Sequence, residues 1–145
     1  MSSIDSGSGP TLRLAKSLKD VPHFLYQLSH YKKGIDVGGE LATVDEKDET
    51  HWASHGADIP FVFGNTVGPD LYWNTKIQVP FTPEEERLSA YVRSAFVNFA
   101  ATGHPGNDFD AGVVLDLETD ALGGVTRRPD FKRAECAFWD AAAAL

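Results

Sequence analysis

Residues 82–105 read TPEEERLSAYVRSAFVNFAATGHP and are the most strongly patterned stretch of the chain. Thr82 can cap a helix, and Glu85 three residues later completes a capping box. Pro83 stands at the first helical position, where its missing N–H costs nothing. A glycine and a proline near the end of the stretch stop the pattern. We therefore predict a helix over residues 83–101.

One face of this predicted helix is strongly apolar. Its apolar residues recur at steps of three and four, which is the spacing of side chains on a single helix face. Such a face has to be covered, either by the rest of the fold or by a partner. The residues on it are Leu88, Tyr91, Val92, Ala95, Phe96 and Phe99.

The flanking segments predict strands and further helices. Residues 23–31 are apolar or aromatic with few interruptions, a pattern typical of a strand that is covered on both faces. Residues 113–117 are a second strand candidate, helical spacing predicts a helix over residues 11–19, and a terminal helix is expected from residue 136. We predict an α/β fold with an incomplete sheet and flanking helices, because so few strands do not form a self-sufficient sheet.

Composition limits the classes of function. The chain has 145 residues and a net charge of −8, from 13 basic and 21 acidic residues, so the broad basic face of a nucleic-acid-binding protein is not expected. No stretch approaches the roughly 20 apolar residues of a membrane span. Residues 1–10 are rich in glycine and serine and lack a secretory signal. We expect a flexible tail there, a folded segment over residues 11–145, and cytoplasmic residence by default, with secretion of a parent enzyme left open.

Residues 51–58, HWASHGAD, are the candidate centre for chemistry, and two of the possible interpretations are weak. His51, His55 and Asp58 have spacing that a metal site could use, but a zinc-protease helix needs glutamate after the first histidine, and a glycine disfavours a helix here. Ser54 beside His55 could be a nucleophile and its base, but the side chains of adjacent residues generally diverge.

The third interpretation is that His55 is the general base of a serine hydrolase. A histidine in a loop after a buried strand, followed by Gly56 that lets the backbone turn, suits a base that serves both nucleophile and leaving group. A surface or structural histidine would have the same spacing. The nearby Phe61 and Phe63 are expected to pack in the core rather than to line a substrate pocket.

Several ordered motifs resemble the C-terminal portion of the type B carboxylesterases, the cholinesterase-like branch of the α/β-hydrolases. The stretch 22–30, PHFLYQLSH, resembles the last long strand before that family's histidine loop, and 52–64, WASHGADIPFVFG, resembles the loop and the segment after it. The remaining similar stretches are 81–89 (FTPEEERLS), 98–105 (NFAATGHP) and 135–140 (ECAFWD).

The resemblance implies that the chain is the C-terminal part of an α/β-hydrolase fold, with a small ester as substrate and with neither a metal nor an organic cofactor. It identifies His55 as the catalytic triad histidine, Gly56 as the residue that permits the turn, and Asp58 as the acidic residue that supports the site. The sequence departs from the family because it contains no Gly-x-Ser-x-Gly, no His-Gly-Gly-Gly and no triad acid. We therefore expect the isolated chain to be a catalytically incomplete fragment.

Two alternatives remain open at this point. The chain could be a non-enzymatic binding or regulatory module that docks its apolar helix face on a partner, through Leu88, Tyr91, Val92, Phe96 and Phe99. It could also be a truncated gene product without a function.

Overall fold

A computed structural model describes residues 5–18, 20–30, 53, 56–64 and 80–142 of the chain, with residues 5–8 described by their backbone alone. The predicted helices over residues 11–19 and 83–101, the terminal helix and both predicted strands are found, with shifted ends. The elements are α1 (Asp5–Ser17), β1 (Leu25–Leu28), α2 (Ile59–Phe63), α3 (Pro83–Thr102), β2 (Val114–Leu117), the 3-10 helix η1 (Asp120–Leu122), β3 (Thr126–Arg128) and α4 (Arg133–Ala142).

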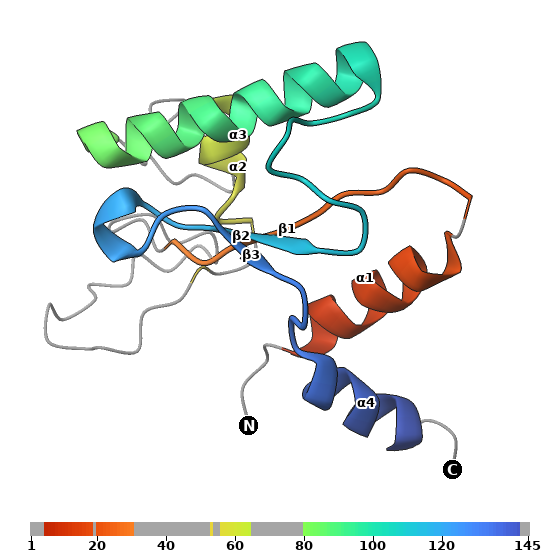
Figure 1. Cartoon of the computed structure of the whole chain (residues 1–145). Helices are drawn as coiled ribbons and strands as arrows, with labels where there is room; N and C mark the ends of the chain where they lie inside the picture. Colours follow the sequence, from red (N-terminus) through yellow and green to blue (C-terminus); the bar gives the residue numbers. More distant parts are fainter. Residues whose placement is uncertain (1–4, 19, 31–52, 54–55, 65–79, 143–145) are drawn as a thin grey trace, which may run out of the picture.

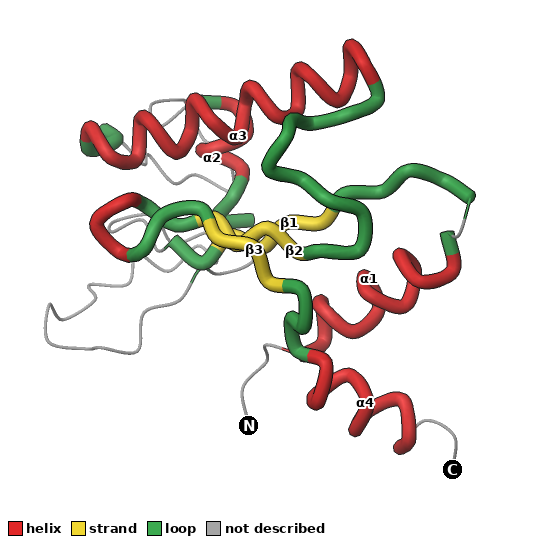
Figure 2. The backbone as a smooth tube through the Cα atoms, in the orientation of Figure 1, coloured by secondary structure: helices red, strands yellow, loops and turns green. Residues whose placement is uncertain are grey.

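The described residues form a three-stranded mixed sheet in the order β1-β2-β3. β1 pairs with β2 in parallel, with Leu25 opposite Val114, and β2 pairs with β3 in antiparallel orientation. Figure 1 shows α2 and α3 on one side of this sheet and α1 with α4 on the other. Figure 2 shows the same layers as a tube, with the three strands between the two groups of helices. An exposed ion pair of 3.1 Å between Arg13 and Asp140 joins α1 to α4.

The start of α3 has the predicted capping box. The Thr82 hydroxyl accepts a hydrogen bond from the Glu85 N–H, and the Thr82 N–H donates to the Glu85 carboxylate at 2.8 Å. Pro83 lies in the first turn, and Gly103 ends the helix in a left-handed conformation. This element was predictable because its start and stop signals are local.

The apolar face of α3 is covered over part of its length. Leu88, Val92 and Ala95 are buried in the core, together with residues of β1, β2 and α2. Further along the helix, Phe96 and Phe99 are 44% and 47% exposed. The fold of the described residues therefore covers the face from Leu88 to Ala95, and it leaves Phe96 and Phe99 about half exposed.

Three other elements differ from the predictions. Two-sided burial is found along β2, whereas β1 is an edge of the described sheet and Tyr26 in its middle is 36% exposed. Helix α1 begins at Asp5, within the residues expected to be a flexible tail. Strand β3 was not predicted because its side chains are polar and exposed; Arg128 pairs with the buried Asp116 of β2 at 2.9 Å.

A buried histidine joins three elements at one end of the sheet. His30, 7% exposed, lies just beyond β1. Its Nε2 lies 3.1 Å from a carboxylate oxygen of Glu85 in α3, and its Nδ1 hydrogen-bonds to Glu118, the residue after β2. We call these three residues the His30 bridge.

We expect His30→Ala to lower the free energy of unfolding by about 3–5 kcal/mol, because it removes the imidazole that pairs with two largely buried carboxylates. Urea unfolding followed by circular dichroism measures the change. Arg13→Ala is the control: it removes an exposed ion pair, so its effect should stay within about 1 kcal/mol. Equal effects of the two substitutions would contradict the structural role of the His30 bridge.

Tyr91 ties the middle of α3 to the loop before β2. Its hydroxyl donates to Asp108 Oδ2 at 3.1 Å. Burial raises the pKa of the Tyr91 phenol above its ordinary value of 10.0, and the hydrogen bond and charge of Asp108 raise that pKa further, against a lowering effect of Arg127. The folded chain therefore holds this proton at a pH at which the unfolded chain releases it.

We expect stability to fall as the pH rises above about 10, because proton release by the unfolded chain then favours unfolding. This contribution is fully present below the unfolded pKa of tyrosine and is lost as the pH rises through the folded-state pKa. Tyr91→Phe should show a shallower loss than the parent chain in urea unfolding between about pH 8 and about pH 11. An identical slope in both proteins would contradict the structure.

Candidate functional site

The residues predicted to form the site are divided between the described and undescribed parts of the chain. His55 lies outside the described residues, as do His51 and Ser54. Gly56 and Asp58 are described, and both are half-buried. The structure therefore defines the turn that follows His55 in the chain and the surroundings of that turn.

Gly56 begins this turn with φ = 80°, in the left-handed region that a residue with a Cβ rarely adopts. The N–H of Ile59 donates to the carbonyl of Gly56 at 3.1 Å and closes the turn. Asp58 directly precedes α2, yet its side chain makes no capping hydrogen bond to that helix.

The Asp58 carboxylate binds a residue that the sequence did not single out. The hydroxyl of Tyr26, in the middle of β1, donates to Asp58 Oδ2 at 2.8 Å. The Tyr26 ring packs edge-on against Phe96 of α3, with ring centroids 6.0 Å apart. These contacts join β1, α3 and the turn after His55. No local pattern could have found Tyr26, because it precedes Asp58 by 32 residues.

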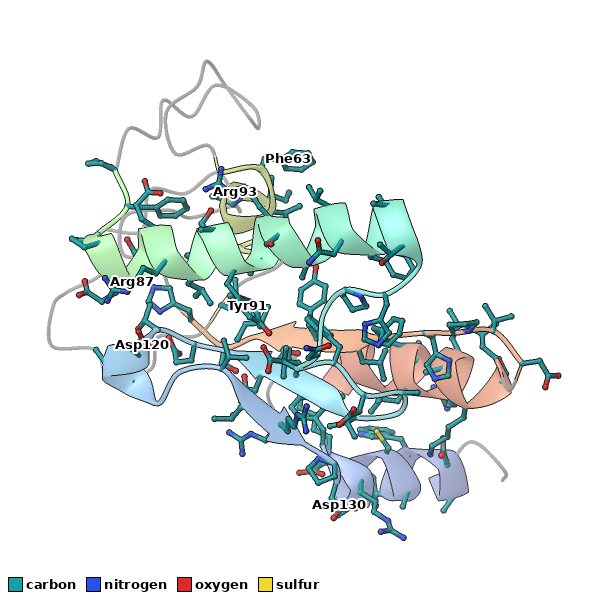
Figure 3. All side chains as sticks on the ribbon, turned by 45° about the horizontal axis from the view of Figure 1, so that its top comes forward. Phe63, Arg87, Tyr91, Arg93, Asp120 and Asp130 are labelled. Carbon is teal, nitrogen blue, oxygen red and sulfur yellow. The ribbon has the colours of Figure 1, made fainter. Side chains whose placement is uncertain are left out.

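Helix α2 is fixed to α3 from the other side of the turn. Phe61 is fully buried, and its carbonyl accepts a hydrogen bond of 2.9 Å from the hydroxyl of Ser89, which is also fully buried. The Phe61 ring lies edge-on to the His30 imidazole at 5.6 Å. The core position predicted for Phe61 is confirmed. The one predicted for Phe63 is wrong: its side chain is 73% exposed and points away from the strands in Figure 3, near Arg93.

The electrostatics of the turn favour a protonated phenol beside an acidic acceptor. Burial, reinforced by the hydrogen bond and charge of Asp58, raises the pKa of Tyr26 above its ordinary value of 10.0. Tyr26 therefore stays a hydrogen-bond donor throughout the neutral range.

Within the described ranges, no group of three or more metal-binding side chains occurs, and no helix has the length and apolarity needed to cross a membrane.

Comparison with known proteins places this geometry in a family. A model of the carboxylesterase family matches residues 7–135. A solved structure of a PNB (para-nitrobenzyl) esterase superposes with a TM-score of 0.53 at 23% sequence identity. That match covers 79% of this chain and 21% of the esterase, so the chain spans about a fifth of the length of that protein. A search of curated proteins finds no match.

The mixed sheet, the helices on both of its sides and the structural match show an α/β-hydrolase fold. The family match covers most of the sequence, including the candidate turn, α2 and α3. The chain belongs to the carboxylesterase family.

Proposed function

We propose that the chain contributes the C-terminal part of a carboxylic-ester hydrolase site, with His55 as the general base. The family match over residues 7–135 is the observation that supports this most strongly, because it spans His55 and the turn behind it. The attachment of that turn to β1 and α3 gives further support, since a general base has to be held in place by its surroundings.

In this proposal His55 takes the proton of a serine hydroxyl while the serine oxygen attacks the ester carbonyl. The imidazolium then gives the proton to the leaving alcohol, and an acyl-enzyme remains. A water molecule next loses a proton to His55 and attacks the acyl group, and the serine regains its proton when the acid leaves. Gly56 allows the loop to turn, and Asp58 supports the loop through Tyr26.

The serine and the oxyanion hole have to come from other segments, because the 145 residues contain neither a Gly-x-Ser-x-Gly nor a His-Gly-Gly-Gly motif. We infer the same for the triad acid, which lies between the serine and the histidine in the order of the family. Loss of the nucleophile alone costs about 10⁶ in kcat in a well-studied serine protease. We therefore propose that this chain by itself does not hydrolyse esters.

The purified chain should neither react with a serine-directed fluorophosphonate nor hydrolyse a nitrophenyl ester, because no activated serine is present. Gel fluorescence and release of nitrophenol measure the two reactions, with an intact carboxylesterase as positive control. Stoichiometric labelling, or turnover that His55→Ala abolishes, would show that this chain supplies its own nucleophile.

The role of His55 itself is testable in a chimera in which this chain replaces the corresponding segment of the PNB esterase. His55→Ala should lower kcat/KM by at least about 10³-fold, because the general base is lost. His51→Ala, four residues earlier in the sequence, is the matched control and should leave kcat/KM unchanged. Equal effects of the two substitutions on a folded chimera would refute the proposed role.

A second candidate function is docking, and the exposure of Phe96 and Phe99 on α3 favours it. In this alternative, the exposed part of the apolar face of α3 binds a partner. Leu88, Tyr91 and Val92 belong to the same face. An uncovered apolar patch should bind a hydrophobic dye or drive self-association. A monodisperse monomer with cooperative melting and no dye binding would argue against it.

A further inference from the structure

We propose that Tyr26 is a positioning residue for the candidate site: its hydroxyl holds Asp58, and thereby the turn that follows His55, against β1. This inference rests on the proposed function, because the turn matters for catalysis through His55. Neither the motifs nor the family match assigns a role to Tyr26.

The position of the Tyr26 hydroxyl is fixed by the sheet and by α3. Its main chain belongs to β1, which pairs with the fully buried strand β2. Its ring lies edge-on to Phe96 of α3, at an interplanar angle of 74°. With the backbone fixed by the sheet and the ring by the helix, the oxygen that reaches Asp58 at 2.8 Å has little freedom to move.

Asp58 uses its carboxylate for this contact rather than for the helix that it precedes. Aspartate immediately before a helix commonly accepts hydrogen bonds from the first N–H groups of that helix. Here the Asp58 side chain makes no such bond, and its Oδ2 accepts from Tyr26 instead. The carboxylate thus stabilises the link between turn and strand.

The hydrogen bond between Tyr26 and Asp58 also restrains Gly56, because the turn between Gly56 and Asp58 is short. The Gly56 carbonyl accepts from the Ile59 N–H, and the Asp58 carbonyl accepts from the Val62 N–H at 2.9 Å. The two ends of the turn are therefore locked to the start of α2. Gly56 is bonded directly to His55, so any displacement of the turn reaches the backbone of the proposed base.

Tyr91 provides a matched control within the same chain. It also donates to an aspartate, Asp108, at 3.1 Å, and burial is likewise the largest cause that raises its pKa. Its bond joins α3 to the loop before β2 and does not involve the turn. Figure 3 shows Tyr91 projecting from α3 toward the strands. Tyr91→Phe removes the same kind of bond as Tyr26→Phe at a different place.

Nuclear magnetic resonance on the full, isotope-labelled chain tests the inference. In Tyr26→Phe, the amide exchange rates of Ile59 and Val62, whose N–H groups donate to the carbonyls of the turn, should rise at least about tenfold relative to the parent chain, and the His55 ring signals should shift. In Tyr91→Phe, both should match the parent chain. Asp58→Asn, which keeps an acceptor oxygen, should retain the slow exchange, and Asp58→Ala should lose it.

Unchanged amide exchange at Ile59 and Val62 in Tyr26→Phe would overturn the inference. So would a rise spread evenly over the chain, since that is the effect of a general loss of stability. Failure of the proposed function appears elsewhere, in the chimera: if His55→Ala leaves ester turnover intact while Tyr26→Phe loosens the turn, Tyr26 positions the turn and the role given to His55 is wrong.

Discussion

The His30 bridge is the interaction on which the arrangement of the described residues depends. A largely buried imidazole has carboxylates at both of its ring nitrogens, and those carboxylates belong to elements that are distant in the sequence. Glu85 also closes the capping box of α3, so one side chain both starts the helix and holds it to the sheet. Burial of such polar groups is tolerated when they are paired, and within the described residues every buried side-chain nitrogen or oxygen has a hydrogen-bond partner.

Phe61 connects the His30 bridge to the candidate site. The Phe61 ring contacts His30 and also Phe81, with centroids 4.8 Å apart, while its carbonyl is bound by Ser89. Helix α2 is thereby fixed against α3. The turn from Gly56 to Asp58 lies between two fixed points, namely α2 on one side and Tyr26 of β1 on the other. A loop held in this way suits a residue whose chemistry depends on its position.

The two edges of the described sheet differ in character. β3 is short and polar, and its Arg127 and Arg128 are paired with Asp110 and Asp116. Charged, short edge strands discourage pairing with a further strand. β1 lies at the other edge, near the exposed aromatic part of α3.

Helix α3, its caps and its apolar face could be predicted from the sequence alone. Its capping box, and the apolar residues spaced three and four apart, lie within one short continuous stretch of the chain. The family followed from several ordered motifs, and the family match confirmed it. Strand β3 could not be predicted in this way, since its arginines are accommodated by aspartates elsewhere in the fold.

Only the tertiary structure decided which polar side chains meet. Tyr26 and Asp58 are 32 residues apart, and His30 and Glu118 are 88 apart. Their bonds exist because β1, β2, α2 and α3 pack side by side, and no local pattern encodes that packing. The sequence by itself determined the family and the best-marked helix; the fold determined what fastens the turn behind His55, because that depends on contacts between segments that only folding brings together.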